Sequence, residues 1–166
     1  KESGPKAVMG IGGGSPIEAA KSAAILLAND GKTARDLYEF KFTPDKALPI
    51  IAINLTHGTG TETNRFAVVT IPETQYKPAI AYDCIYPSYS IDDPALMMNL
   101  SPEQTIYVSI DAVIHSVEAA TTKVASPYSI STAKECIELV SKYLPVINKD
   151  PQNKEARYYL LYASIL

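Results

Sequence analysis

The chain has 166 residues, a length that suits one domain and allows a sizeable buried core. With 46% hydrophobic and 20% charged residues, its composition is that of a folded globular protein and not of a disordered one. The formal net charge of -3, without any Lys/Arg-rich stretch, removes the electrostatic case for binding nucleic acid or an anionic membrane surface.

The cysteines and the apolar segments indicate where the protein works. Cys84 and Cys136 lie far apart and form no C-x-x-C motif, so a reducing compartment is expected and a disulfide framework is not. No uninterrupted apolar run approaches the ~20 residues that cross a bilayer, and no basic-then-apolar signal peptide opens the sequence. We therefore expect a cytoplasmic protein that does not enter a membrane.

Both ends of the sequence predict a fragment. Lys1 opens the chain without a Met, shortly before the first predicted strand. Leu166 closes an apolar helical pattern that no Gly, Asn or Pro terminates. A helix that ends in this way would lack its packing partner, so we expect missing sequence on both sides.

The first elements predict the opening half of a βαβ unit. Residues 7–11 form a short apolar strand, and the glycine turn at residues 12–15 breaks it. Pro16 suits the first turn of a helix, which residues 29–31 end. The apolar face of that helix repeats at roughly helical spacing, at Ile17, Ala20, Ala24 and Leu27.

A second strand and loop repeat this arrangement. Residues 48–53 form a continuous apolar run, as expected of a strand covered on both faces, and lead into the polar, glycine-bearing loop 56–62. Two further strand candidates follow at residues 66–71 and 79–82. A stretch rich in Pro, Tyr, Ser and Asp then runs to Pro94.

Helix signals dominate after about residue 99. Ser101-Pro102-Glu103-Gln104 is a capping box with Pro at the first helical position, and the helix that it opens is predicted to run to about residue 125. Further helices are predicted over residues 129–144 and after Pro151.

The pattern divides the chain into two predicted domains. Residues 1–99 form a partial, Rossmann-like α/β domain, and residues 100–166 form the start of an all-α domain. Glycines at residues 12–14 would let the backbone approach a phosphate at a helix N-terminus, although the full dinucleotide fingerprint is absent. The hydroxyl-rich loop 56–62 offers donors to a phosphate or ribose. Either loop alone is equally compatible with an ordinary connection, but two such loops after buried strands favour a nucleotide site.

A carboxylate and an imidazole share one face of the long predicted helix. Asp111 and His115 are four residues apart, so both side chains can reach one ion. An oxygen and a nitrogen ligand suit Fe²⁺ or Zn²⁺, whereas an ordinary Asp–His hydrogen bond is the preferred interpretation of an isolated pair. Two ligands do not complete a site, and His57 is the only other histidine.

Three ordered motifs resemble those of the iron-containing (group III) alcohol dehydrogenases. The motifs are Gly12-Gly13-Gly14-Ser15-x-x-Glu18-x-x-Lys21, Thr56-x-Gly58-Thr59-Gly60-Thr61-Glu62 and Asp111-x-x-x-His115-x-x-Glu118. Asp93-Pro94-x-Leu96-Met97 also fits the stretch before that family's helical domain. The resemblance covers nearly the whole chain and implies the dehydroquinate synthase-like fold of that family, with a nicotinamide cofactor held between an α/β and a helical domain.

The resemblance implies NAD(H) or NADP(H) as the cofactor. The cofactor-binding positions that it matches are Gly13, Gly14, Ser15, Leu55, Thr56, Thr59, Asn64, Phe66, Lys77 and Leu96. The first three would hold the pyrophosphate, and the next three would line the phosphate and nicotinamide region. Asn64 and Phe66 would lie near the nicotinamide, Lys77 would bond its ribose, and Leu96 would pack against the cofactor.

The resemblance also implies the metal and the reaction. Asp111 and His115 match the first two ligands of an Fe²⁺ or Zn²⁺ ion, and the remaining ligands, two histidines, would lie beyond Leu166. The metal would polarise an alcohol oxygen while hydride passes between the alcohol or aldehyde and the nicotinamide. No separate catalytic base is expected among these residues. The implied partners are a small-molecule alcohol or aldehyde and further copies of the chain in a homo-oligomer.

Several positions depart from the family pattern. Glu18 replaces the usual Asp, Thr61 the usual Ser, and Leu55 the usual Thr. His57 occupies a position where small residues are common. Its side chain could reach the nicotinamide or substrate, or it could cap its own loop, which is the preferred interpretation.

Two alternative functions remain open on the sequence. Another enzyme of the same superfamily, such as a glycerol or glycerol-phosphate dehydrogenase or dehydroquinate synthase, would share the glycine turn and a metal site. The Gly58-Thr59-Gly60-Thr61-Glu62 pattern favours the alcohol dehydrogenases over these enzymes. A non-catalytic nucleotide-binding module would bind the cofactor without a metal, and the retained Asp111 and His115 argue against it.

Overall fold

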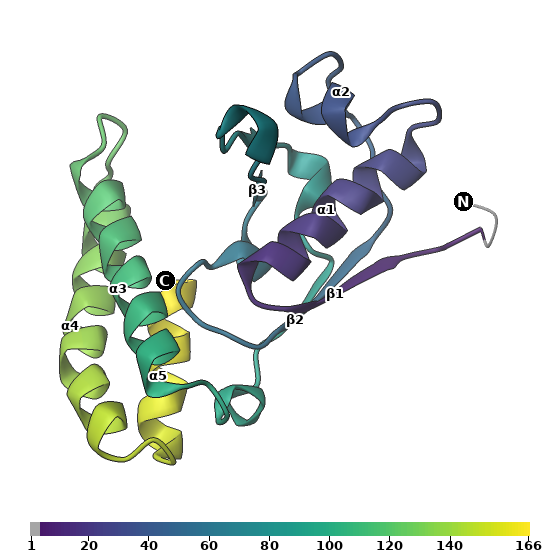
Figure 1. The fold of residues 1–166 in the computed structure, drawn as a ribbon. Helices are drawn as coiled ribbons and strands as arrows, with labels where there is room; N and C mark the ends of the chain where they lie inside the picture. The colour runs from purple at the N-terminus through teal and green to yellow at the C-terminus, as the bar shows by residue number, and fades with distance from the viewer. Residues whose placement is uncertain (1–3) are drawn as a thin grey trace. The chain divides into compact units, whose positions relative to one another are not determined.

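In the computed structural model, which describes residues 4–166, the chain divides into two units. The first takes the chain up to Asn54 together with Thr61–Ile91, and the second takes Leu55–Gly60 together with Asp92–Leu166. Figure 1 traces their elements in chain order. Lys1 lies outside the described residues, and the domain division after residue 99 remains a prediction.

A parallel sheet forms the frame of the first unit. Strands β1 (Val8–Gly12), β2 (Ile50–Asn54) and β5 (Tyr89–Ile91) pair in the order β1-β2-β5. Both pairings are parallel, and Gly12 at the end of β1 lies opposite Asn54 at the end of β2. The carboxyl ends of the strands therefore meet at one edge, which is the edge that binds ligands in open α/β sheets.

Helix α1 (Gly14–Ala28) packs along β1 and contributes Ala24 and Ile25 to the core of this unit. It begins as predicted, with Pro16 in the first turn, and ends at the C-cap Asn29. Gly10 lets the strand approach the helix, because a Cβ there would lie 2.9 Å from the Ala20 Cβ. The buried core of the unit consists of Ala24, Ile25, Leu37, Tyr38, Ile50, Ala67, Ile80 and Ile85.

A two-stranded antiparallel sheet, β3 (Phe66–Val68) with β4 (Ala79–Ala81), completes the first unit. The sequence predicts the first of these strands to extend to Ile71, but the ladder stops before it. The 3-10 turn η2 (Pro72–Thr74) follows, and proline has no N–H to donate to a ladder. Ile71 keeps an isolated bridge with Tyr76.

Several elements of this unit lie where the sequence analysis predicts none. Helix α2 (Ala34–Tyr38) begins at a capping box, in which Thr33 Oγ1 accepts from the Asp36 amide at 3.1 Å and the Asp36 carboxylate accepts from the Thr33 amide at 3.0 Å. Strand β5 lies within the Pro/Tyr/Ser/Asp-rich stretch. Two further 3-10 turns are η1 (Thr61–Thr63) and η3 (Asp83–Ile85).

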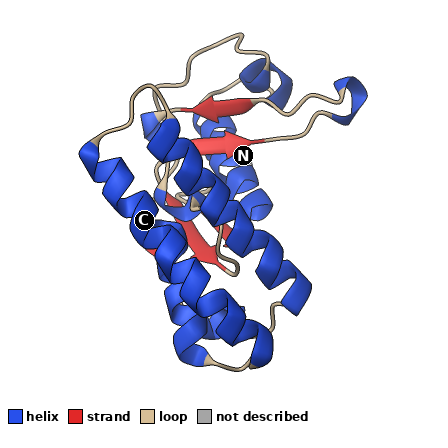
Figure 2. Cartoon of the chain, turned by 90° about the vertical axis from the view of Figure 1, so that its left-hand side faces the viewer, coloured by secondary structure: helices blue, strands red, loops and turns tan. Residues whose placement is uncertain are grey.

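The second unit is helical, as Figure 2 shows. After the 3-10 turn η4 (Pro94–Met97) come α3 (Pro102–Thr121), α4 (Pro127–Lys149) and α5 (Lys154–Ile165). Helix α4 packs against both α3 and α5. The buried core of the second unit consists of Ala112, Cys136, Val140, Tyr143, Ile147, Ala156, Leu160 and Ala163. Within residues 4–166, no helix is both long and apolar enough to cross a membrane.

Each helix of the second unit begins at a side-chain cap. Ser101 Oγ accepts from the Gln104 amide at 3.1 Å and Pro102 occupies the first turn, so the structure shows the Ser101 half of the predicted capping box. Helix α4 is capped by Ser126 and α5 by Asn153. The predicted order, a partial parallel α/β unit followed by helices, is confirmed.

Candidate functional site

The glycine turn predicted to bind phosphate joins β1 to α1. Gly12 has a φ of +147°, which favours glycine, and a Cβ there would lie 2.6 Å from Pro16 Cγ. Gly13 is the N-cap of α1 and has no side chain that could bond the first amides, and the first turn carries no acidic residue. Helix α1 therefore presents the N–H groups of Gly14 and Ser15 at its positive end, where an anion is the favoured ligand.

The second predicted loop, residues 56–62, follows β2, and residues 55–60 pack within the helical unit. Gly58 lies directly against α3: its φ is +109°, and a Cβ there would lie 2.3 Å from the Val108 carbonyl oxygen. A backbone atom cannot rotate away as a side chain can, so this position requires glycine. The predicted cofactor residues Leu55, Thr56 and Thr59 are half-buried on this loop.

His57 fixes the same loop to α3 through a buried hydrogen bond. Its side chain is 1% exposed, and its Nε2 lies 2.7 Å from Ser109 Oγ. Burial, together with the nearby Arg157 guanidinium, lowers the pKa of His57 to about 3, so the ring is neutral at physiological pH. The sequence suggests that His57 caps its own loop or reaches the nicotinamide, whereas the structure joins Nε2 to a neighbouring helix.

Lys21 holds residues 61–66, which comprise the end of this loop and the residues after it. Its side chain is fully buried, and its Nζ donates to the carbonyl oxygens of Thr61 at 2.6 Å, Asn64 at 2.8 Å and Phe66 at 2.8 Å. The side-chain oxygens of Thr61 and Asn64 lie 3.0 and 3.2 Å from the same nitrogen. Lys21 therefore organises two predicted cofactor residues, Asn64 and Phe66, from the helix that begins at the glycine turn.

The surroundings of Lys21 set its charge. Burial lowers the pKa of Lys21 to about 8, and the carboxylates of Glu18 and Glu62 oppose that effect. Burial likewise raises the pKa of Glu18, against the attraction of Lys21. At neutral pH Lys21 is still an ammonium, as its oxygen acceptors favour. The sequence shows Lys21 as one position of the first motif, and its place four residues after Ile17, on the apolar face of the helix, is the signal for its burial.

The remaining predicted cofactor residues are largely exposed. Phe66 in β3 is 48% exposed, Leu96 in η4 is 45% exposed, and Lys77 before β4 is exposed as well. The first unit contains Gly13, Gly14, Ser15, Asn64, Phe66 and Lys77, and the second contains Leu55, Thr56, Thr59 and Leu96. Their contact with a cofactor remains a prediction.

Asp111 and His115 lie on one face of α3, as their spacing predicts. His115 Nε2 is 3.9 Å from Asp111 Oδ1, and the two side chains are 50% and 41% exposed. This distance is too long for a hydrogen bond. It fits two ligands of one ion, since atoms about 2.1 Å from a metal lie at most about 4.2 Å apart. The donor set of one oxygen and one nitrogen suits Fe²⁺ or Zn²⁺.

The described residues supply only part of a metal site. Among residues 4–166, no group of three or more His, Cys, Asp and Glu side chains could hold an ion together. His57 does not join the pair, because its Nε2 is bonded to Ser109 in a buried position. Catalytic metal sites use at least three protein ligands, so the pair needs partners from outside this range.

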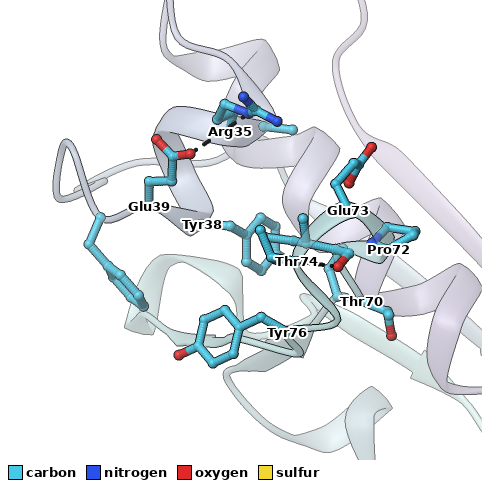
Figure 3. A pocket seen from close by; sticks show the side chains of 12 residues that line it. Arg35, Tyr38, Glu39, Thr70, Pro72, Glu73, Thr74 and Tyr76 are labelled. Atoms are coloured by element: carbon cyan, nitrogen blue, oxygen red, sulfur yellow. Dashed lines mark hydrogen bonds and ion pairs between the residues drawn. The ribbon is translucent and has the colours of Figure 1, made fainter.

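A separate open pocket of about 730 Å³ lies in the first unit, between α2 and the segment from Val69 to Tyr76 (Figure 3). Tyr38, Phe40 and Tyr76 contribute rings to its lining. Its lining within the described chain includes none of the predicted cofactor or metal residues. It is therefore distinct from the candidate site.

Comparison with known protein families tests the resemblance. The model of the iron-containing alcohol dehydrogenases matches residues 1–94, and the model of the C-terminal part of the Fe-containing alcohol dehydrogenase family matches residues 105–166. The chain belongs to the iron-containing alcohol dehydrogenase family. The two matches together cover the glycine turn, the second loop and the Asp111–His115 pair.

Individual relatives of the family are also similar to the chain. The long-chain primary alcohol dehydrogenase AdhA of Thermoanaerobacter ethanolicus is 66% identical over 166 residues, which is 100% of this chain and 42% of that protein. Alcohol dehydrogenase 4 of Schizosaccharomyces pombe is 39% identical over 159 residues, covering 96% of this chain and 37% of that protein. The chain thus spans less than half the length of these relatives.

Solved structures confirm the iron-containing alcohol dehydrogenase fold. The NADH-dependent butanol dehydrogenase A of Thermotoga maritima superposes with a TM-score of 0.92 at 32% identity, covering 99% of this chain and 41% of that one. A sulfoacetaldehyde reductase of Bifidobacterium kashiwanohense, solved with NAD⁺, superposes with a TM-score of 0.90 at 34% identity, covering 96% and 43%.

Proposed function

We propose that the whole protein containing this chain is a metal-dependent oxidoreductase, which transfers a hydride between an alcohol or aldehyde and a nicotinamide dinucleotide. The observation that carries the proposal is that one helix, α3, contacts the second loop and also carries the candidate metal ligands. It holds the second loop through Ser109 and Val108, and it carries Asp111 and His115. A cofactor loop and a metal pair on one rigid element can keep the hydride acceptor and the substrate in a fixed geometry. Membership of the iron-containing family supports this reading.

The cofactor roles follow from the kinds of group that each segment presents. The amides of Gly13, Gly14 and Ser15 hold the pyrophosphate at the start of α1. The hydroxyls of Thr56 and Thr59, with Leu55, line the phosphate and nicotinamide region. Asn64 and Phe66, which Lys21 holds in place, lie near the nicotinamide. Lys77 donates to the ribose, and Leu96 supplies apolar contact.

Asp111 and His115 are proposed as two ligands of the metal. An Fe²⁺ or Zn²⁺ ion held by these two residues would supply Lewis acidity toward the oxygen of the substrate. The chain's own residues bind the cofactor, orient its nicotinamide toward the substrate carbon and exclude water from it. We assign no separate catalytic base to the described residues, since His57 is buried and its Nε2 is hydrogen-bonded to Ser109.

The relatives narrow the proposed substrate and cofactor. Similarity to a long-chain primary alcohol dehydrogenase supports primary alcohols and their aldehydes as substrates. Similarity to an NADH-dependent butanol dehydrogenase and to a reductase solved with NAD⁺ supports NAD(H) over NADP(H). We propose Fe²⁺ as the metal, with Zn²⁺ as the alternative, and a homo-oligomer as the assembly.

The test is alcohol-dependent reduction of NAD⁺ and NADP⁺ by the whole protein, loaded anaerobically with Fe²⁺ or with Zn²⁺. Primary alcohols of increasing chain length are compared with glycerol and with the phosphorylated sugar acid that dehydroquinate synthases use. Turnover of primary alcohols supports the proposal. Turnover of glycerol or of the sugar acid alone would place the protein with another enzyme of the superfamily. Cofactor binding without turnover under any metal would leave a nucleotide-binding module.

For the chain by itself, nucleotide binding without turnover is the second candidate function. The observation that favours it is the incomplete metal site, since the Asp111–His115 pair gains no third ligand within residues 4–166. Titration of the isolated chain with NADH and with Fe²⁺ distinguishes the two cases. NADH binding without stoichiometric metal is the expected result, and tight binding of one ion would contradict it.

A further inference from the structure

The loop of residues 55–60 belongs to the helical unit, although the residues on both sides of it belong to the α/β unit. Two of the contacts of this loop are made with α3. One is the hydrogen bond of 2.7 Å between His57 Nε2 and Ser109 Oγ. The other is the close packing of Gly58 on the Val108 carbonyl oxygen. These contacts fix the loop to α3.

The directions of the hydrogen bonds fix the tautomer of His57. Ser109 Oγ lies 2.7 Å from the carbonyl oxygen of Thr105, which can only accept, so the hydroxyl proton of Ser109 points there. Ser109 must then accept from the Nε2–H of His57, and Nδ1 carries the lone pair. Nδ1 has no hydrogen-bond partner among the described residues. The hydrogen bond from Nε2 to Ser109 therefore connects the ring to α3.

The other end of this chain of bonds is anchored in α5. Arg157 is 1% exposed, and its Nη1 donates to the hydroxyl of Thr105 at 3.0 Å. Thr105 therefore accepts one hydrogen bond at its carbonyl oxygen and another at its side chain. The loop, α3 and α5 are connected by one buried network, in which a low dielectric strengthens each satisfied bond.

We propose that His57 is a positioning residue, which through Ser109 holds the cofactor loop at one place along α3. The inference rests on the proposed function. Asp111 follows Ser109 by two positions on the same helix, so the bond keeps Thr56 and Thr59 at a fixed separation from the metal pair. Correct placement of cofactor and metal decides the rate of hydride transfer, and a shift of about 1 Å is costly.

A role in proton transfer makes a different prediction for the same residue. His57 is 1% exposed and its Nε2–H is already donated to Ser109, so the ring is not placed to exchange a proton with a substrate. A positioning residue changes cofactor affinity and leaves the pH profile of kcat unchanged. A general acid or base changes that profile when it is replaced.

The experiment measures the dissociation constant of NADH by nicotinamide fluorescence on the whole, metal-loaded protein, with metal content as a second readout. Ser109→Ala and His57→Leu each remove the bond, and each is expected to raise the dissociation constant about tenfold with metal content unchanged. The double variant should show no further increase, because both changes remove the same bond. His57→Gln, whose side-chain amide can donate to Ser109, should restore most of the affinity.

Ser116 offers a matched control on the same helix. Its hydroxyl is buried and donates to the carbonyl oxygen of Ala112 at 2.8 Å, so it is bonded to its own helix as Ser109 is. Ser116→Ala should therefore leave the NADH dissociation constant unchanged. If His57→Leu does not fold, the comparison of Ser109→Ala with Ser116→Ala decides the question alone.

Three results would overturn the inference: no loss of affinity in Ser109→Ala, equal losses in Ser109→Ala and Ser116→Ala, or additive losses in the double variant. A changed pH profile of kcat in His57→Gln would also overturn it, in favour of a proton-transfer role. A wild-type protein that binds no NADH would instead contradict the proposed function itself.

Discussion

Lys21 Nζ lies 2.6 Å from the carbonyl oxygen of Thr61, and this bond joins the helix after the glycine turn to the end of the second loop. Both partners belong to the first unit. The carbonyl oxygens of Asn64 and Phe66 accept from the same ammonium. Replacing Lys21 should therefore loosen the attachment of residues 61–66 to helix α1.

Lys21→Met keeps the length of the side chain and removes its donors. We expect the free energy of unfolding to fall by about 3 kcal/mol, because one buried and two partly buried carbonyl groups lose their partner, and we expect weaker NADH binding. Urea denaturation of the whole protein measures the first effect. Lys123→Met, at an exposed position, is the control and should change stability by less than about 0.5 kcal/mol. Equal effects of the two substitutions would contradict the role of Lys21.

Gly58→Ala tests the close approach of the cofactor loop to α3. The new Cβ would lie 2.3 Å from the Val108 carbonyl oxygen, so either the loop or the helix must shift. Gly31→Ala is a matched control: its φ of +72° is also left-handed, but nothing lies within 4 Å of its added Cβ. We expect about 1–2 kcal/mol of destabilisation for Gly31→Ala, from backbone strain alone, and clearly more for Gly58→Ala. Similar denaturation curves for the two variants would show that the close contact has no energetic consequence.

The buried, neutral ring of His57 predicts sensitivity to acid. Its pKa falls from 6.5 to about 3 on folding, so between these values the unfolded chain binds more protons than the folded one. The contribution of His57 to stability is therefore fully present above pH 6.5 and decreases as the pH falls toward 3. His57→Gln does not titrate and should flatten this part of the curve. The measurement is the free energy of unfolding of both proteins across that range, and parallel curves would rule out the effect.

Much of the fold could be predicted from local patterns. The apolar runs of β1 and β2, the proline and asparagine at the ends of α1, and the Ser101 cap of α3 are signals within single segments. Helix α2 is not predicted by periodicity, because so short a helix shows none, although its Thr33-x-x-Asp36 capping box is visible in the sequence. Strand β5 was missed because only its pairing with β2 makes it a strand.

Part of the candidate site could also be predicted, because its signal lies within a single segment. The Asp111–His115 pair follows from helical spacing alone, and the structure places both side chains on one face of α3. The supports of the cofactor loop do not follow from spacing. His57 and Ser109 are 52 positions apart in the chain, and Lys21 and Thr61 are 40 apart, so their bonds depend on tertiary packing.

The central claim is that Asp111 and His115 hold a metal on which alcohol oxidation depends. The most direct measurement is the metal content and alcohol-dependent NADH formation of the whole protein, loaded anaerobically with Fe²⁺, beside Asp111→Asn. Glu103→Gln, the same change at another exposed carboxylate of α3, is the control. We predict that metal and turnover are both lost in Asp111→Asn and both retained in Glu103→Gln. Full metal loading and turnover in Asp111→Asn would contradict the account.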